Sequence, residues 1–162
     1  MLPKVKRTKT PEQALASLMR LAARAERSSG DALRLMRTWG VEPSQRQDVL
    51  RKLIGMKFID DSRYAESFVR DKLKFSGWGA HKIRTALRAK GIDAAVIEQA
   101  LEQTDSESMG QRLTARLERK MQSVKYATPY ELKNKLMRYG LSLGYDFETV
   151  AETVAQLIHT EE

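Results

Sequence analysis

The chain has 162 residues, of which 41% are hydrophobic and 31% are charged. This is enough apolar material for one modest domain or a short array of small ones, with a heavily charged surface. The 29 Lys and Arg residues exceed the 21 Asp and Glu residues, and the net charge of +8 favours polyanions or acidic protein surfaces as partners.

Cysteine is absent, which excludes disulfides and cysteine metal sites and fits a reducing compartment. No run of about 18 apolar residues occurs, so we expect no membrane-spanning segment. The N-terminus is basic, but no apolar stretch follows it. We therefore expect no secretory signal, a loose basic tail over residues 1–10 and a cytoplasmic location.

Several helix starts are marked by capping residues. Thr10 supplies a capping hydroxyl, Pro11 occupies the first helical position, and Gln13 follows three residues after the cap. The same spacing occurs at Ser28 with Asp31, Ser44 with Gln47, and Thr128 with Glu131. These side chains satisfy backbone N–H groups that a helix start leaves without partners, so we predict a helix after each.

Apolar residues recur at helical spacing between these starts, and no segment shows the sustained alternation of a strand. The closest approach to a strand is the pair Phe58 and Ile59. The sequence therefore predicts an all-α chain. The expected helices cover residues 11–26, 29–39, 44–56, 61–75, 80–90, 94–103, 107–124, 129–142 and 146–159.

A pattern of glycine, apolar residue and acidic residue occurs three times, beginning at Gly40, Gly91 and Gly144, at intervals of about 50 residues. We interpret each glycine as the left-handed end of a helix, the apolar residue as a core contact, and the acidic residue as lying near the next helix N-terminus. In the third case Gly140 is an alternative helix end, which would place Leu143 in a loop.

The repeated pattern divides the chain into three units of three short helices. The predicted units are 11–57, 58–105 and 106–162, after the tail 1–10. Connections are short and no linker separates the units, so we expect an elongated, solenoid-like array of three tandem three-helix repeats.

Basic residues recur at helical spacing on the first helix of each unit, and more of them gather between residues 70 and 90. Residues three, four or seven apart share a helix face. A solvated face is the simpler interpretation of any one stripe, but three stripes in equivalent places favour a binding surface. The candidate residues for partner or nucleic-acid binding are Arg20, Arg24, Arg27, Arg63, Arg70, Lys74, Lys82, Arg84, Arg88, Arg112, Arg116 and Arg119.

No pattern of catalytic or metal-binding residues is evident. The two histidines, His81 and His159, each lack a second ligand one helical turn away. Asp60 and Asp61 could form a carboxylate pair, but we interpret one of them as the cap of the helix that begins near Ser62. We therefore predict a protein that is not an enzyme, with no cofactor and no metal.

Two tryptophans have different settings. Trp39 lies beside a repeat glycine at a helix end, and we assign it to the core. Trp78 lies between two glycines in a predicted turn. We interpret it as covering the joint between the first and second units, with stacking on a base or a contact with a protein partner as alternatives.

The central part of the chain resembles the RecX family of regulatory proteins. The resemblance runs through residues 58–65 (FIDDSRYA), Phe68 and Val69, then Gly79, Ile83, Arg84, Leu87 and 90–92. Residues 24–28 are similar to that family's first-unit motif, and 135–136 and 144–147 are a weaker match in the third unit. The likeness extends from about Ala14 to His159. It departs at Ala25, where the family often has Glu.

The resemblance implies a function and a fold. Proteins of this family bind the RecA recombinase and its filament on single-stranded DNA, and they restrain its recombinase, ATPase and coprotease activities. Their fold is a chain of three-helix repeats. The implied role is regulation of DNA recombination, DNA repair and the SOS response in the cytoplasm, with filament capping and groove binding both open as modes of action.

One alternative is a sequence-nonspecific DNA-binding helical protein that does not act through RecA, since three-helix units can present a helix to a groove. Another is a helical scaffold whose charge serves solubility. Single- or double-stranded DNA, contacted through its phosphates, is a further candidate partner. We expect a monomer, with a dimer that exchanges the first helix as the alternative.

Overall fold

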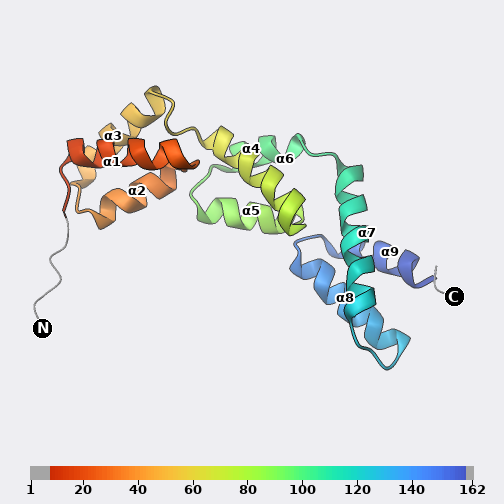
Figure 1. The fold of residues 1–162 in the computed structure, drawn as a ribbon. Coiled ribbons are helices and arrows are strands. Elements are labelled where there is room, and N and C mark those ends of the chain that lie inside the picture. The colour runs from red at the N-terminus through yellow and green to blue at the C-terminus, as the bar shows by residue number, and fades with distance from the viewer. Residues whose placement is uncertain (1–7, 160–162) are drawn as a thin grey trace, which may run out of the picture. The chain divides into compact units, whose positions relative to one another are not determined.

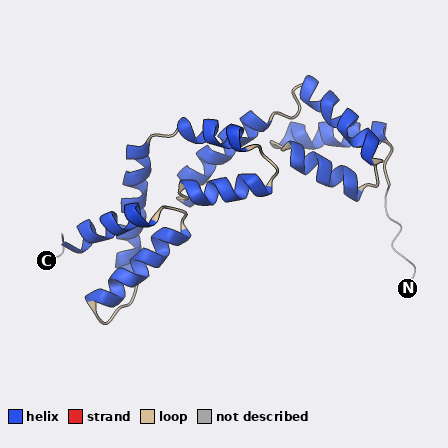
Figure 2. Cartoon of the chain, turned by 180° about the vertical axis from the view of Figure 1, so that it is seen from behind, coloured by secondary structure: helices blue, strands red, loops and turns tan. Residues whose placement is uncertain are grey.

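The computed structural model describes residues 8–159, and all regular structure within this range is helical (Figures 1 and 2). The α-helices are α1 (Pro11–Arg24), α2 (Ser29–Thr38), α3 (Pro43–Gly55), α4 (Asp61–Asp71), α5 (Ala80–Ala89), α6 (Ala94–Glu102), α7 (Ser106–Ser123), α8 (Pro129–Ser142) and α9 (Phe147–His159). A π-helical turn, Lys72–Ser76, continues α4. The prediction of an all-α chain is confirmed for these residues. None of the helices in this range is long and apolar enough to cross a membrane.

The predicted caps account for three helix starts. Thr10 and Ser28 both form complete capping boxes, with Gln13 and Asp31 returning the second bond. Thr128 accepts a hydrogen bond from the N–H of Glu131, whose carboxylate binds the N–H of Ala127 rather than that of Thr128.

The predicted cap at Ser44 is wrong. Helix α3 begins one residue earlier, at Pro43, and Glu42 precedes it without a side-chain capping bond. Proline needs no hydrogen-bond partner at the first helical position and its fixed φ suits a helix start. That preference places the start of α3 ahead of the serine.

The contacts of the chain form two compact units. Unit 1 holds the described residues up to Glu66 together with Leu87–Ile97, and unit 2 holds Ser67–Ala86 and the described residues from Glu98 onward. These boundaries fall inside the predicted middle repeat. The division into 11–57, 58–105 and 106–162 therefore remains a prediction about the repeated sequence pattern.

The core of unit 1 is built mainly from α1, α2 and α3, with α3 packed on both other helices. Its buried side chains are Ala14, Leu18, Ala32, Met36, Val41, Val49, Leu50, Leu53 and Ile59. Val41 follows the first repeat glycine, so this position is a core contact as predicted. Trp39 is partly buried against the same core.

The corresponding core of unit 2 lies among α7, α8 and α9, which all contact one another. Its buried side chains are Leu113, Leu117, Leu132, Leu136, Leu143, Tyr145, Val150 and Val154. Gly140 lies inside α8, where an added Cβ would be 2.6 Å from Cγ1 of Val150. This glycine therefore allows α8 and α9 to approach closely, and it does not end the helix.

All three repeat glycines adopt the left-handed conformation. The φ angles are +68° at Gly40, +79° at Gly91 and +95° at Gly144. The predicted helix ends at these positions are confirmed, and Gly144 is the end of the third. The acidic residues differ from one another: Asp146 accepts a bond from the N–H of Thr149 at 2.7 Å, whereas Glu42 makes no capping bond.

In unit 1 the N-terminus of α2 lies against the glycine turn that ends α5. The hydroxyl of Ser28 donates to the carbonyl oxygen of Lys90 at 3.3 Å, and the Cα of Gly91 is 3.5 Å from where a Cβ of Gly30 would be. A Cβ at Gly30 would also overlap the Lys90 carbonyl oxygen. We call this contact the Gly30–Gly91 junction.

Unit 2 contains the same arrangement one repeat later. The N–H of Gly79, at the start of α5, donates to the Leu143 carbonyl oxygen at 2.6 Å, and the N–H of His81 donates to that of Gly144 at 3.0 Å. An added Cβ at Gly79 would lie 2.6 Å from the carbonyl of Gly144. In this Gly79–Gly144 junction, helix N–H groups bind carbonyl groups at the end of another helix, which satisfies both sets.

The first repeat glycine, Gly40, takes part in neither junction and is contacted by the chain ahead of α1. The N–H of Lys9 donates to the Trp39 carbonyl oxygen at 2.9 Å, and the methyl group of Thr8 lies beside Gly40. The Lys9 ammonium also lies 4.7 Å from the centre of the Trp39 ring. Residues 8 and 9 of the predicted tail are thus bound to unit 1, and residues 1–7 lie outside the described range.

Asp31 is a buried acidic residue at the Gly30–Gly91 junction. Its carboxylate accepts from the N–H of Ser28 and forms ion pairs with Arg34 at 3.1 Å and Lys90 at 3.3 Å. Burial raises the pKa of Asp31, but the hydrogen bond from Ser28 and the charge of Lys90 outweigh this effect and leave the pKa below its ordinary value.

We predict that Gly30→Ala and Gly79→Ala each lower the free energy of unfolding by about 1–3 kcal/mol, because the added methyl group forces the junction apart. The control is Gly110→Ala in α7, where an added Cβ meets nothing within 4 Å. That substitution should stabilise the protein by roughly 0.5–1 kcal/mol through helix propensity. Urea denaturation measures all three. Equal effects at Gly30 and Gly110 would contradict the proposed tight contact.

We predict that Asp31→Asn lowers the stability at pH 7 by about 1–3 kcal/mol, since charged hydrogen bonds at the junction are lost. The pKa of Asp31 is lower in the folded than in the unfolded chain. Its ionisation therefore stabilises the fold at high pH, and this contribution is lost as pH falls through the folded-state pKa, below about pH 4. Thermal unfolding of both proteins between pH 7 and 3 tests this. A difference that stays constant would exclude the ionised carboxylate as its source.

Candidate functional site

The described residues, 8–159, contain no group of three or more His, Asp or Glu side chains placed to hold a metal. Asp60 and Asp61 have structural partners. An oxygen of Asp60 accepts from the N–H of Arg63 at 3.1 Å, which confirms that one aspartate caps α4. Asp61 accepts from the N–H of Ser29 at 2.8 Å and so binds the start of α2.

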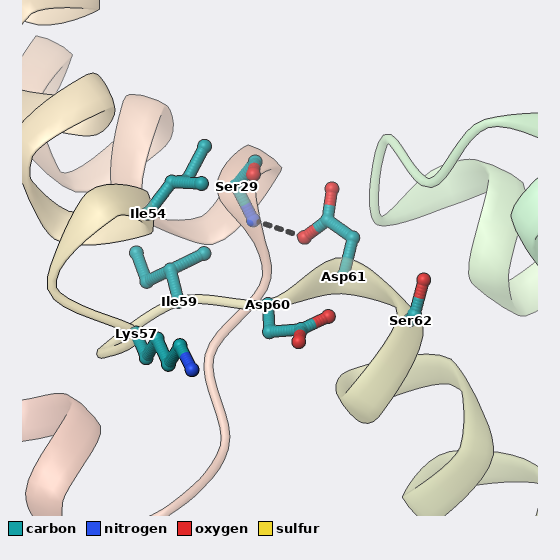
Figure 3. Close-up of a pocket in the computed structure, with 7 residues that line it drawn as sticks. All are labelled: Ser29, Ile54, Lys57, Ile59, Asp60, Asp61 and Ser62. Carbon is teal, nitrogen blue, oxygen red and sulfur yellow. Dashed lines mark hydrogen bonds between the residues drawn. The ribbon is translucent and has the colours of Figure 1, made fainter.

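These two carboxylates line a cavity of about 510 Å³ in unit 1 (Figure 3). The lining residues are Ser29, Ile54, Lys57, Ile59, Asp60, Asp61 and Ser62. Figure 3 shows the bond between Asp61 and Ser29 crossing from the start of α4 to the start of α2. One oxygen of each aspartate therefore accepts a backbone N–H at a helix start. We interpret the two carboxylates as structural groups where α2, α3 and α4 meet.

The predicted basic stripe on α1 is shorter than expected. Arg20 and Arg24 lie on the helix and are exposed, and Arg20 donates to the Ser17 hydroxyl at 3.3 Å. The helix ends at Arg24, and Ala25 is already extended. Arg27 therefore lies in the following loop, partly buried, and the prediction that it continues the helical stripe is wrong.

Arg63 forms several contacts within unit 1. Its guanidinium donates to Glu26 at 2.7 Å and to the carbonyl oxygens of Lys57 and Phe58. The hydrogen bond to Glu26 raises the pKa of Arg63 above its ordinary value. An arginine with these partners has little capacity left for a phosphate.

The other two residues predicted to share its face, Arg70 and Lys74, are both exposed. Lys74, however, lies in the π-helical turn Lys72–Ser76, where the spacing of 3.6 residues per turn does not hold. The predicted stripe along α4 therefore ends with Arg70, and Lys74 belongs to a different local surface.

Two of the three candidate basic residues on α5 have hydrogen-bond partners within the described part of the chain, and the third is exposed without one there. Arg84 binds the carboxylate of Glu98 through two nitrogens, at 2.6 and 3.3 Å, which raises the pKa of Arg84 and lowers that of Glu98. Lys82 donates to the carbonyl oxygen of Ser142 at 3.3 Å. Arg88 is exposed.

The stripe on α7 lies on one helix, as predicted. Arg112 and Arg116 are close enough to Tyr145 for their charges to oppose the rise that burial causes in the pKa of that phenol. Arg116 also donates to the carbonyl oxygen of Phe75 at 3.1 Å, and Arg119 is exposed. That these residues bind a partner remains a prediction.

Trp78 has neighbours other than those predicted. The Lys72 and Lys82 ammonium groups each lie 4.6 Å from the centre of its ring, and the Phe68 ring meets it edge-on at 6.2 Å. The next residue, Gly79, forms the junction with Gly144 in unit 2. Trp78 thus flanks a contact with the turn that follows α8, whereas the sequence suggested the joint between the first and second predicted units.

An exposed aromatic residue was missed by the sequence reasoning. Phe75 in the π-helical turn has 69% of its surface exposed, and the Lys74 ammonium lies 5.3 Å from its ring centre. The available signal was an aromatic residue that directly follows a lysine and precedes a Gly-Trp-Gly turn, within a basic segment. The periodicity of the sequence placed Phe75 in a regular helix over residues 61–75, so its exposure was not predicted.

Comparisons with known proteins agree on one family. A family model described as RecX, second three-helix domain, matches residues 60–101. The regulatory protein RecX of Prosthecochloris aestuarii is 31% identical over 112 residues, which cover 69% of this chain and 72% of that protein. That of Clostridium botulinum is 36% identical over 106 residues, or 64% of this chain and 49% of that protein.

The chain spans about half the length of the first curated relatives that it matches, 49% and 42% for those from C. botulinum and Oceanobacillus iheyensis. Among solved structures, RecX from Lactobacillus salivarius has a TM-score of 0.81 at 21% identity, over 93% of this chain and 97% of that chain. A second crystal structure of regulatory protein RecX has a TM-score of 0.83 at 22% identity, over 90% and 73%. These likenesses show a shared fold.

We predict that Arg116→Met increases amide hydrogen exchange in Lys72–Trp78, because the bond to the Phe75 carbonyl oxygen is lost, while global stability falls by no more than about 1.5 kcal/mol. Arg119→Met removes an exposed arginine from the same helix and serves as the control. Exchange measured by mass spectrometry reports both. Equal exchange in the two variants would mean that Arg116 does not hold this segment.

Proposed function

Because this chain belongs to the RecX family of regulatory proteins, we propose that it binds the RecA recombinase and its filament on single-stranded DNA and inhibits recombinase, ATPase and coprotease activity. The observation that carries this proposal is the 31% identity to a regulatory protein RecX over 72% of that protein's length. The proposed outcome is regulation of recombinational DNA repair and the SOS response in the cytoplasm.

The distribution of charge supports a role in binding a nucleoprotein filament. A net charge of +8 gives long-range attraction to phosphates and to acidic protein surfaces, with an affinity that falls as salt rises. Two of the twelve candidate residues, Arg63 and Arg84, are already paired with carboxylates. The proposed contact residues are therefore the exposed candidates that the described part of the chain leaves without an ion pair: Arg20, Arg24, Arg70, Lys74, Lys82, Arg88 and Arg119.

A DNA-binding protein that does not act through RecA is the second candidate. The exposed Phe75 beside Lys74 favours it, because an aromatic ring among cations is suited to nucleic acid. The two candidates differ in what they require. The first needs RecA for its effect, and the second binds DNA equally well without it.

The distinguishing experiment is an ATPase assay of RecA on single-stranded DNA with the protein added below the RecA concentration. Strong inhibition is expected under the first proposal. Unchanged ATPase activity, together with tight binding to DNA in the absence of RecA, would replace the first proposal with the second. Binding to neither would favour a helical scaffold.

We predict that the combined variant Arg24→Glu, Arg70→Glu and Arg119→Glu requires roughly 10-fold more protein for half-inhibition, because three attractive contacts become repulsive. The matched control reverses three exposed basic residues outside the candidate set, Lys52, Lys133 and Arg138. Both variants carry the same net charge, so total charge cancels from the comparison. Thermal unfolding verifies that each is folded. Equal loss in the two variants would reduce the effect to net charge and exclude a defined surface.

A further inference from the structure

One surface of unit 2 combines an exposed aromatic ring with several cations. Lys74 contacts the Phe75 ring and Arg116 binds the Phe75 carbonyl oxygen. Three residues further along, Trp78 is contacted by Lys72 and Lys82. We call these six residues the Phe75 surface. We propose that the Phe75 surface binds single-stranded nucleic acid directly, with a base stacked on the Phe75 ring and neighbouring phosphates on the cations. This contact requires no recombinase, so it goes beyond the regulation of RecA, and it deepens the second candidate function by naming the surface and the kind of strand that it binds.

The Phe75 ring is available to a ligand. Its exposed fraction is 69%, so most of the ring can be reached from solvent. The Lys74 ammonium contacts the ring, 5.3 Å from the ring centre. A cation against an aromatic ring leaves other parts of the ring surface open for a planar group.

The backbone beneath the ring is fixed at both ends. Arg116 donates to the Phe75 carbonyl oxygen at 3.1 Å, and the N–H of Trp78 donates to the Lys72 carbonyl oxygen at 3.1 Å. Gly77 ends the π-helical turn with a φ of +66°, and an added Cβ there would lie 2.6 Å from Nε of Arg116. The ring is therefore presented by an ordered segment, which lowers the entropy cost of stacking a base on it.

Trp78 has a different part in this surface. Its ring already contacts the Lys72 and Lys82 ammonium groups, both at 4.6 Å, and the edge of Phe68. These contacts leave it poorly suited to stack a base. They place two ammonium groups against the Trp78 ring, which follows the Phe75 segment in the chain, and each can bind a phosphate oxygen.

Charge and shape together favour a single strand over other partners. Residues 70–82 contain Arg70, Lys72, Lys74 and Lys82 against one acidic residue, Asp71, so an anionic partner is attracted. In a duplex the base faces are covered by their neighbours, whereas a single strand offers them to an aromatic ring. An acidic protein surface would satisfy the cations but supplies no planar face for Phe75.

The test measures binding of a fluorescently labelled oligothymidylate to the full chain by anisotropy, without RecA. Phe75→Ala should weaken binding roughly 10-fold, and Phe75→Trp should retain it, since a planar ring is what stacks on a base. Phe147→Ala is the matched control: Phe147 is also in unit 2 and 67% exposed, but lies between Asp146 and Glu148. Its removal should leave affinity unchanged.

An oligonucleotide of the same length with abasic sites isolates the stacking contact. The wild-type protein should bind it about as weakly as Phe75→Ala binds the normal strand, and Phe75→Ala should lose little further affinity on it. The salt dependence of binding should be similar for wild type and Phe75→Ala, because the phosphate contacts remain. Equal affinity of Phe75→Ala and wild type for the normal strand would overturn the proposal, as would undiminished binding of the abasic strand.

The RecA ATPase assay distinguishes failure of this inference from failure of the proposed function. If Phe75→Ala binds oligothymidylate normally but no longer inhibits RecA, the ring is an anchor for a protein and the base-stacking proposal is wrong. If the variant loses oligothymidylate binding and still inhibits RecA, the inference holds independently of the regulatory role. If the wild-type protein does not inhibit RecA but shows the predicted Phe75-dependent binding, only the proposed function fails.

Discussion

The close approach of a helix start to a glycine turn is the contact on which the arrangement of each unit depends. At the Gly30–Gly91 junction the backbone of α2 comes so near the end of α5 that a single methyl group would overlap a carbonyl oxygen. The Gly79–Gly144 junction shows the same restriction: the N–H groups of Gly79 and His81, at the start of α5, donate to the carbonyl oxygens of the two residues that follow α8. Gly91 and Gly144 therefore have two roles at once: each ends its own helix with a positive φ, and each leaves space for another helix start.

This contact also explains how the charged residues are used. Asp31 pairs with Lys90 at the Gly30–Gly91 junction, and Arg63, near the start of α4, pairs with Glu26. Arginines and lysines on the outer faces of α1, α4, α5 and α7 take no part in these contacts. Exposed charges contribute little to stability. These residues can therefore serve partner binding with little effect on the fold.

Much of the fold follows from local sequence signals. The capping residues Thr10, Ser28 and Thr128, together with the repeat glycines, place the ends of most helices within one or two residues of the prediction, because caps and left-handed glycines act over one turn. The candidate surface was harder to predict. A stripe drawn at helical spacing assumes a regular helix, and this assumption fails at Arg27, beyond the end of α1, and at Lys74 in the π-helical turn. Pairing of Arg63 with Glu26, 37 positions away, depends on tertiary contacts that no local pattern encodes.

The exposure of Phe75 was not predicted for the same reason: the residue lies in a π-helical turn. This turn shows how a local change in helix type can produce a binding surface. The π-helical turn shifts Phe75 out of register with the apolar face of α4, so a residue that a regular helix could bury becomes exposed. Arg116 and Gly77 then stabilise this exposed position without any contact at the junction glycines. A local change of helix type thus exposes an aromatic ring among basic residues. It does so without disturbing the Gly79–Gly144 junction between α5 and α8. For this reason substitutions of Phe75 should affect binding far more than stability, whereas substitutions of Gly79 should do the reverse.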